Sequence, residues 1–272
     1  MNSIYTGGTM SSVLESRIAV PAASAVASSR KIVNLVPVAI VWGVLLVIYM
    51  GLRIYQGLYA FEYGLDSTSP DFQKYWMTLL RVEVPVILAA SIVVWSYLWF
   101  TRDKHLDKLD SETELRRYFS LTAWFVLYTF AFIFIASFNG EADATWHQTV
   151  VRDTVFTPSH IVLFYAAIPM YILFGVSCLI YAMTRLPKFA NSFSVPLIMV
   201  VLGPGLILPN LGFNEWGHAF WLTEEIFTHP LHWGFVVLGW TGIGLGGVLL
   251  QFCIRMGELF KEISATQRAT AK

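Results

Sequence analysis

Five of the six histidines lie in two short stretches of the chain, each close to acidic or amide side chains. In the first stretch, Asp143 and His147 are four residues apart, a spacing that puts both on one face of a helix. His160 follows Pro158, a residue that suits the first turn of a further helix. One carboxylate and two imidazoles can bind copper, zinc or iron and leave positions open for water or dioxygen. The pattern predicts a metal site formed by Asp143, His147 and His160.

The second stretch contains Asn214, His218 and His232. Asn214 and His218 again have the four-residue helical spacing. In one unbroken helix His218 and His232 would lie about 21 Å apart, so a shared site requires the chain to turn back, which Pro230 allows. These three residues are the candidate ligands of a second metal site.

Each set also has a reading without a metal. Asp143 could pair with Arg152, leaving the histidines to form hydrogen bonds at an interface. Asn214 could cap a helix and Glu215 could hold His218 by a hydrogen bond. The sixth histidine, His105, lies in a run of charged residues and is expected to be solvated.

The composition indicates that the elements carrying these residues lie in a membrane. The chain is 56% hydrophobic and only 13% charged, against about 25% charged residues in an ordinary soluble domain. Its formal net charge is zero, which gives no reason to expect a nucleic-acid partner. Cys178 and Cys253 both fall in apolar runs and are expected to be small core residues.

A membrane-spanning helix needs about 20 predominantly apolar residues. Six stretches meet this requirement, so we expect an all-α bundle of about six transmembrane helices, at roughly 33–58, 82–100, 118–138, 159–183, 193–212 and 231–254. Residues 1–31 are predicted to be a flexible tail, 32–256 the transmembrane domain and 257–272 a second tail.

The distribution of positive charge predicts the orientation of the bundle. If both termini are cytoplasmic, 14 of the 18 Lys and Arg residues lie on the inside, as the positive-inside rule expects. The connections 139–160 and 213–232, which carry both candidate metal sets, then meet on the outer, periplasmic side.

At these positions the sequence resembles the C subunits of the copper membrane monooxygenases, the family of particulate methane monooxygenase and ammonia monooxygenase. The resemblance runs from about residue 53 to 240 and rests on a specific combination of motifs: Asp143-Ala-Thr-Trp-His147-Gln, Arg152-Asp153-Thr, Phe156-Thr-Pro-Ser-His160, Tyr181-Ala-Met-Thr-Arg-Leu-Pro187, Leu208-Pro-Asn, Asn214-Glu-Trp-Gly-His-Ala-Phe-Trp221 and Pro230-Leu-His-Trp-Gly-Phe235. The amino half agrees in Gly64-Leu-Asp-Ser67, Tyr75-Trp-Met77 and Thr101-Arg-Asp103.

The resemblance implies that Asp143, His147 and His160 form one family metal site and that Asn214, His218 and His232 form a nearby copper site, to which we assign the catalytic role. It implies copper as the metal, with zinc as an alternative occupant in isolated protein, dioxygen as co-substrate and quinol as reductant. It also implies the A and B subunits of the monooxygenase as partners, in a trimer of heterotrimers located in a bacterial inner or intracytoplasmic membrane.

One departure from the family pattern precedes the first metal set. The segment Phe138-Asn-Gly-Glu-Ala-Asp143 differs from the family's usual Phe-Thr-Glu-Gln-Asp, which keeps the ligand but changes the approach to it. Gly217-His-Ala-Phe220 resembles ammonia oxidisers, whereas Gly64-Leu-Asp-Ser67 and Thr149-Val-Val-Arg152 resemble hydrocarbon oxidisers. Methane, ammonia and short alkanes all remain candidate substrates.

Three alternatives belong to other classes of protein. A membrane transporter of metal ions would place polar residues along the bilayer midplane, and the predicted spans are almost free of them. A haem protein would need facing histidines inside two spans, which the sequence does not offer. A purely structural membrane protein whose metal sites are not catalytic is the third alternative.

Overall fold

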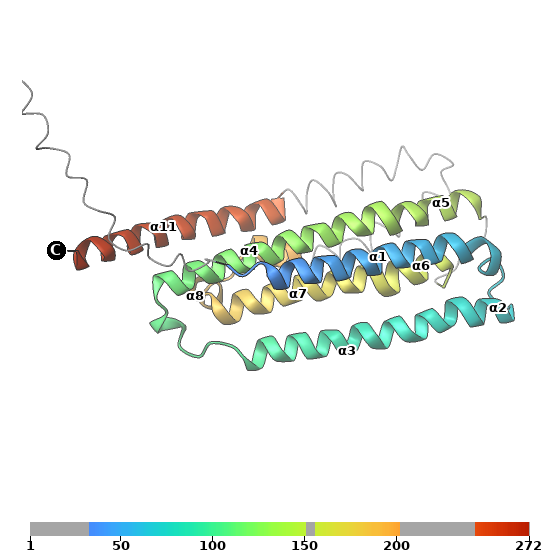
Figure 1. The fold of residues 1–272 in the computed structure, drawn as a ribbon, viewed down its shortest axis with the longest axis horizontal. Coiled ribbons are helices and arrows are strands. Elements are labelled where there is room, and N and C mark those ends of the chain that lie inside the picture. Colours follow the sequence, from blue (N-terminus) through green and yellow to red (C-terminus); the bar gives the residue numbers. More distant parts are fainter. Residues whose placement is uncertain (1–32, 151–155, 202–242, 272) are drawn as a thin grey trace, which may run out of the picture. The chain divides into compact units, whose positions relative to one another are not determined.

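The computed structural model describes residues 33–150, 156–201 and 243–271. All regular structure in these ranges is helical (Figure 1), as the sequence predicts. Five helices of the described residues are long and apolar enough to cross a membrane: Val36–Tyr63, Pro70–Phe100, Ser111–His147, Pro158–Arg185 and Ile243–Thr270. The predicted span at 193–212 lies mostly outside the described residues, and its described part is helical from 195 to 201.

The spans are built from shorter helical elements joined end to end. These are α1 (Val36–Tyr63), α2 (Pro70–Phe72), α3 (Thr78–Phe100), α4 (Ser111–Phe134), α5 (Glu141–Thr149), α6 (Pro158–Val162), α7 (Ile168–Arg185), α8 (Pro187–Asn191) and α11 (Gly246–Thr270). Three π-helical segments connect some of them: η1 (Gln73–Met77), η3 (Ile135–Gly140) and η4 (Leu163–Ala167). A 3-10 turn, η2 (Leu106–Lys108), lies between α3 and α4.

The second span begins earlier than predicted. The Ser69 hydroxyl accepts a hydrogen bond from the backbone N–H of Phe72 (3.1 Å), and Pro70 occupies the first turn. Both features start a helix. The predicted start at residue 82 was wrong because Lys74 and Arg81 interrupt the apolar run without interrupting the helix.

The last span also continues beyond its predicted end at 254. Arg255 on α11 pairs with Glu258 and Glu262 on the same helix and with Glu114 on α4. These ion pairs let the helix continue to Thr270 after the apolar run has ended.

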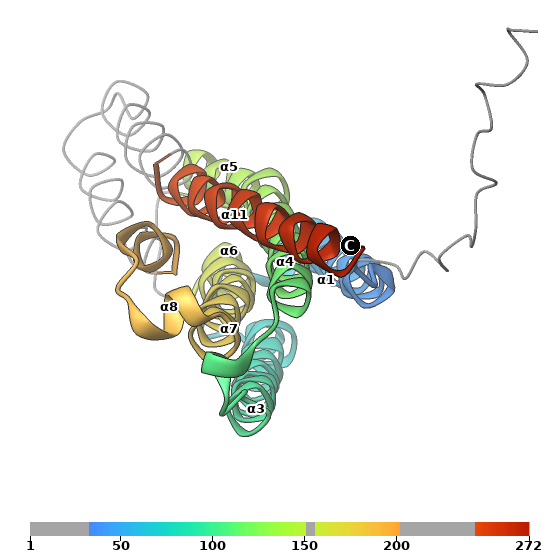
Figure 2. The ribbon, with the colours of Figure 1, turned by 90° about the vertical axis from the view of Figure 1, so that its left-hand side faces the viewer.

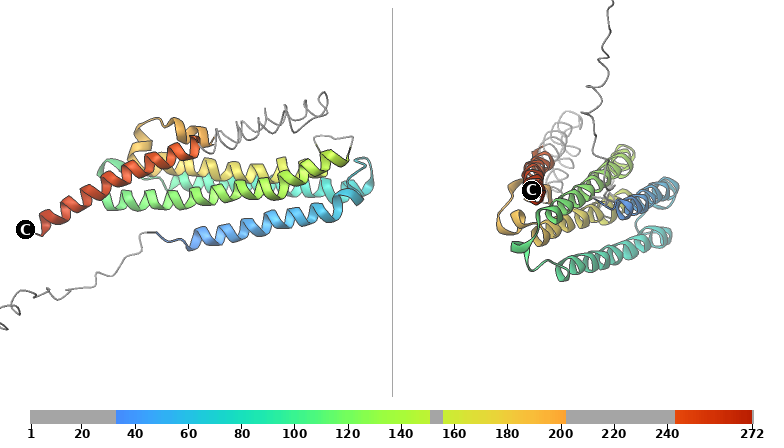
Figure 3. Two further views of the ribbon diagram at one scale, coloured as in Figure 1. Left: turned by 90° about the horizontal axis from the view of Figure 1, so that it is seen from above. Right: turned by 60° about the vertical axis from the view of Figure 1, so that its left-hand side comes forward.

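The core lies between α4 and α7. In the most apolar window of the span that contains α7, 56% of residues are buried, against 11% for α1, so α7 is central and α1 peripheral. Helices α1, α3 and α11 pack around the central pair (Figures 2 and 3). At the centre the rings of Tyr128 and Tyr171 stack with centroids 4.2 Å apart, and the Tyr128 hydroxyl donates to the Val200 carbonyl (2.8 Å).

The two ends of the described bundle differ in their polar contacts. At the end that we call the Arg185 end, where α3 and α7 finish and α4 begins, Arg117 pairs with Asp103 (2.7 Å) and donates to the Arg185 carbonyl (2.8 Å). At the opposite end, which we call the His160 end, α1 finishes and α6 begins. Candidate ligands of the first metal set lie at the His160 end.

Candidate metal centre

Two separate parts of the chain bring the first predicted ligand set together. Asp143 and His147 lie on α5 and His160 on α6. One ligand atom from each of the three residues lies within 4.8 Å of the others. The Asp143 Oδ1 atom is 3.6 Å from His147 Nδ1 and 3.5 Å from His160 Nε2. The predicted sharing of one helix face by Asp143 and His147 is confirmed, as is the helix start at Pro158.

The three side chains are buried. Their exposed fractions are 9% for Asp143, 6% for His147 and 9% for His160. Phe164 packs on the His160 ring, with ring centroids 4.7 Å apart. In such a site a metal ion would be shielded from bulk water, which strengthens its electrostatic interaction with the Asp143 carboxylate.

A backbone contact sets the tautomer of His147. Its Nδ1 lies 2.8 Å from the carbonyl oxygen of Asp143, one helical turn earlier. A carbonyl can only accept, so Nδ1 carries the proton and Nε2 carries the lone pair that a metal requires. This second contact of a ligand ring is the kind that orients metal-binding histidines.

The spacing of the ligand atoms fits a transition metal. Bonds of about 2.0–2.2 Å to nitrogen and oxygen place tetrahedral ligands about 3.4 Å apart. The 3.5 Å separation of Asp143 Oδ1 and His160 Nε2 is close to this value. Two imidazoles and one carboxylate are borderline donors that suit copper, zinc or iron.

Packing at the His160 end holds α5 and α6 in place. Trp146, which is 2% exposed, lies between the ligands of α5 in sequence and packs its ring against Phe61 of α1, with centroids 5.3 Å apart. A Cβ on Gly64, just after α1, would overlap Pro158 Cγ at the start of α6. Helix α1 therefore contacts both ligand-bearing helices.

The second predicted set, Asn214, His218 and His232, lies outside the described residues, and so does Arg152, the alternative partner of Asp143. His105 is exposed on the loop between α3 and α4, as predicted for a solvated histidine.

The structure also buries three polar residues that the sequence did not identify as candidate site residues. Gln56 on α1 is 4% exposed, Glu83 on α3 is 8% exposed and Asn139 on η3 is 1% exposed. None of the three lies in the middle of a predicted span: Gln56 is near the end of 33–58, Glu83 is the second residue of 82–100 and Asn139 follows 118–138. With a span starting at 82, Glu83 counts as an end residue, whereas the helix from Pro70 places it in the interior of the span.

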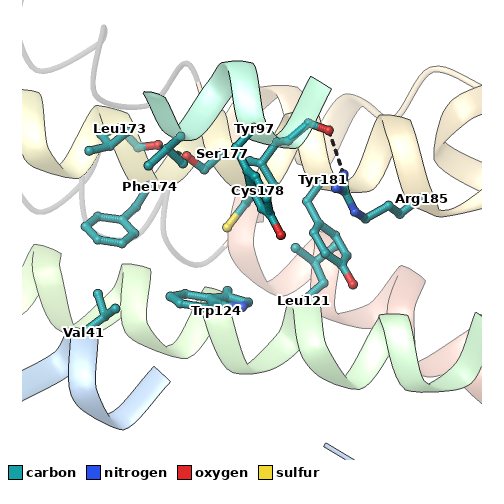
Figure 4. Close-up of a pocket in the computed structure, with 12 residues that line it drawn as sticks. Val41, Tyr97, Leu121, Trp124, Leu173, Phe174, Ser177, Cys178, Tyr181 and Arg185 are labelled. Carbon is teal, nitrogen blue, oxygen red and sulfur yellow. Dashed lines mark hydrogen bonds between the residues drawn. The ribbon is translucent and has the colours of Figure 1, made fainter. Parts of the chain in front are cut away.

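A separate cavity of about 440 Å³ lies toward the Arg185 end, among α1, α3, α4 and α7 (Figure 4). Trp124, Phe174, Cys178 and Tyr181 are among its lining residues. Among the described residues that line it, none is His, Asp or Glu, and most of its lining is apolar.

Fold and site together define an integral membrane protein, helical throughout its described regular structure, with a buried group of Asp and His side chains that could hold a metal ion. The chain belongs to the ammonia monooxygenase/methane monooxygenase C-subunit family, whose model matches residues 20–263. This membership implies one component of a copper membrane monooxygenase that acts with partner subunits. A comparison with curated proteins gave no match.

Proposed function

We propose that Asp143, His147 and His160 bind copper, and that the chain works with its partner subunits to hydroxylate a small substrate with dioxygen. The observation that carries the proposal is the convergence of three buried ligand side chains from two stretches of chain, within 4.8 Å of one another. Membership of the C-subunit family supports copper over zinc and iron.

The residues of the site have distinct roles in this proposal. Copper, when bound, would supply a centre able to bind dioxygen and exchange electrons. The Asp143 carboxylate balances positive charge in a buried place, and the backbone carbonyl of the same residue orients His147. Phe164 packs beside His160 and keeps that side of the site apolar.

The second set, Asn214, His218 and His232, belongs to the same proposal as a second, catalytic copper site. Its support is the helical spacing of Asn214 and His218 and the resemblance of the surrounding motif to the family pattern. The substrate is methane, ammonia or a short alkane, each small enough to arrive through the lipid. Quinol is the proposed electron donor.

We also propose a place for the chain in a larger assembly. Both termini are cytoplasmic and the metal sites lie toward the periplasm, as the distribution of Lys and Arg favours. The partners are the A and B subunits of the monooxygenase, in a trimer of heterotrimers. Large apolar side chains on α1 and α3, such as Val47 (71% exposed) and Val93 (67%), offer surface for those partners and for lipid.

The test uses the intact complex purified from membranes, with His160→Ala, His147→Ala and Asp143→Ala made one at a time. Each variant is expected to lose one metal equivalent per copy of this chain, measured by elemental analysis of the assembled complex. His105→Ala, at an exposed histidine, is the control and is expected to retain its metal. Full metal content in all three site variants would refute the proposed site.

A second series separates binding from chemistry. His218→Ala and His232→Ala are compared with the first three variants for both metal content and turnover. If the two sets each lose metal but only the second set loses turnover, then Asp143, His147 and His160 form a structural metal site. Loss of turnover in both sets is the result expected from the proposal.

A further inference from the structure

Buried polar side chains gather at the His160 end of the described bundle. Atoms in this group are almost inaccessible to solvent and have no hydrogen-bond partner within the described residues: Gln56 Oε1, Trp76 Nε1, both Glu83 carboxylate oxygens, both Asn139 amide atoms, Trp146 Nε1, Thr157 Oγ1 and Ser159 Oγ. They come from α1, η1, α3, η3, α5, the N-cap of α6 and α6 itself. Each such group needs a physical explanation, because an unsatisfied buried polar atom is unfavourable.

Contacts of α1 place Gln56 at the level of the metal ligands. The Tyr49 hydroxyl donates to the Ala167 carbonyl (3.0 Å), which fixes α1 against the antiparallel helix that carries His160. Gln56 lies two helical turns after Tyr49 on α1, and His160 lies two turns before Ala167 on the opposite helix, so the two residues are at the same level. Helix α1 thus brings a buried amide level with a candidate ligand.

Asn139 lies at the same level on a third helix. The Tyr49 ring contacts the Phe134 ring (5.8 Å between centroids), and the Phe61 ring contacts Trp146 (5.3 Å). Between these two contacts α1 runs alongside η3. Asn139 falls in this interval, one turn before Asp143.

Glu83 is placed by the parallel packing of α3 on the helix that carries His160. The Trp95 indole N–H donates to the Leu173 carbonyl (3.4 Å). Twelve residues before Trp95 is Glu83, and twelve residues before Leu173 is Ile161, so these two residues lie at the same level. Leu80, one turn from Glu83, packs on the buried cluster that contains Ile161, in agreement with this register.

Among the residues that contribute these atoms, only Glu83 has a carboxyl group. Within the described residues no positively charged side chain pairs with that carboxyl group. Elements packed on α3 carry the following titratable or charged side chains: Lys74 and Tyr75 on η1, Tyr165 on η4, and Tyr171, Cys178, Tyr181 and Arg185 on α7. None of them forms an ion pair or hydrogen bond with the Glu83 carboxyl group. An ionisable residue inside a membrane span is costly and is a marker of proton or ion paths.

We propose that Gln56, Glu83, Asn139 and Ser159 line a hydrated polar compartment beside the candidate metal centre, and that Glu83 relays protons through it. The inference rests on the proposed function. Hydroxylation with dioxygen consumes two electrons, from a quinol-class donor, and two protons. One oxygen atom enters the substrate and the other leaves as water. The Glu83 carboxyl gives its proton to a compartment water, becomes a carboxylate and is reprotonated by water from outside.

The decisive variant is Glu83→Gln in the intact complex, because glutamine keeps the size and polarity of the side chain but cannot transfer a proton. Turnover is expected to fall at least tenfold, with unchanged metal content and an altered dependence of turnover on pH. Glu83→Asp is expected to restore part of the rate. Glu62→Gln, at an exposed acid on α1, is the control and is expected to keep the full rate.

Two further measurements make the test independent of turnover alone. Infrared spectra of the wild-type complex should contain the carbonyl stretch of a buried protonated carboxyl group, and spectra of Glu83→Gln should lack this band. Gln56→Leu, which keeps the bulk but removes the amide, should slow turnover without loss of metal.

Unchanged turnover and pH profile in Glu83→Gln would overturn the relay, and so would loss of metal or assembly in this variant, since Glu83 would then be structural. Failure of the proposed function has a different signature, namely full metal content in His160→Ala.

Discussion

At the scale of single residues, the position of His160 depends on a glycine that is distant in sequence. Gly64 follows the last turn of α1 and lies against Pro158, in the first turn of the helix that carries His160. A side chain on Gly64 would also overlap the carbonyl oxygen of Ala60. The α1 end and the α6 start can therefore approach closely only because this residue has no Cβ.

Gly64→Ala is expected to displace Pro158 and, with it, His160. The overpacking should lower stability by about 1–3 kcal/mol and reduce the metal content of the purified complex. Gly57→Ala, where the added Cβ would meet only an Arg53 nitrogen at 3.7 Å, is the matched control. Equal metal contents in the two variants would contradict the argument.

A second residue-scale prediction concerns acid sensitivity. The His105 backbone N–H and then the Arg117 guanidinium hold the pKa of Asp103 below its usual value. Since the folded-state pKa is depressed, the contribution to stability is complete above the unfolded value of about 3.9 and is lost as pH falls through the folded value.

Asp103→Asn is therefore expected to lower the thermal midpoint at pH 7 and to make that midpoint less dependent on pH below about 4. Thermal unfolding of the complex across this range measures the effect. Asp107→Asn, at an exposed position on the same loop, should leave the pH dependence unchanged. An identical acid response in wild type and Asp103→Asn would rule out this source of stability.

At the scale of helical elements, the central packing depends on close contact between α4 and α7. A Cβ on Gly175 of α7 would lie 3.1 Å from Tyr128 Cε2 of α4. The Tyr128 ring cannot easily move away, because it is stacked on Tyr171 and bound to the Val200 carbonyl. Small residues of this kind allow membrane helices to approach.

Gly175→Ala is expected to lower the free energy of unfolding by about 1–3 kcal/mol. Gly51→Ala on α1, where the added Cβ meets nothing within 4 Å, should be neutral or slightly stabilising. Thermal unfolding in one detergent compares the two variants. A neutral Gly175→Ala would mean that Tyr128 can shift at little cost.

The sequence predicted which helices carry the site better than it predicted where those helices begin and end. The spacing of Asp143 and His147 and the proline before His160 were sufficient to predict two helix segments that carry the candidate ligands. Apolar runs missed the early start at Pro70, because charged residues near a helix end interrupt the run but not the hydrogen bonding. Glu83 was for this reason predicted to lie at the end of a span and not in its interior.

The distance between the two parts of the site could not be predicted from spacing. It depends on the close approach of α1 to α6 and on the π-helical segments η3 and η4, which neighbour the ligands on both helices. Side-chain periodicity does not reveal a π-helical turn, in which hydrogen bonds span five residues instead of four.

At the scale of the whole molecule, one buried ion pair joins α11 to the central helices. Arg255 donates to both oxygens of Glu114, at 3.0 and 2.9 Å. The Glu114 side chain is 5% exposed and that of Arg255 22%. This pair is bidentate, with two guanidinium N–H groups on the two carboxylate oxygens, a geometry that arginine can form and lysine cannot.

Arg255→Ala is expected to destabilise the protein by about 2–4 kcal/mol, because it leaves the Glu114 carboxylate buried without its partner. Adding Glu114→Gln should recover part of that loss. A double-mutant cycle on thermal unfolding measures the coupling. If the losses of the two single variants simply add, the pair contributes nothing specific to the attachment of α11.

Because η3 comes directly before α5, the direction in which Asp143 and His147 point depends on how η3 winds. A π-helical turn holds about one residue more than an α-helical turn, so an added residue, or the same residues wound as an α-helix, would turn α5 by about 100°. Asp143 and His147 would then face away from His160, although every ligand would still be present in the sequence. Substitutions in this stretch should be tolerated more readily than an added residue.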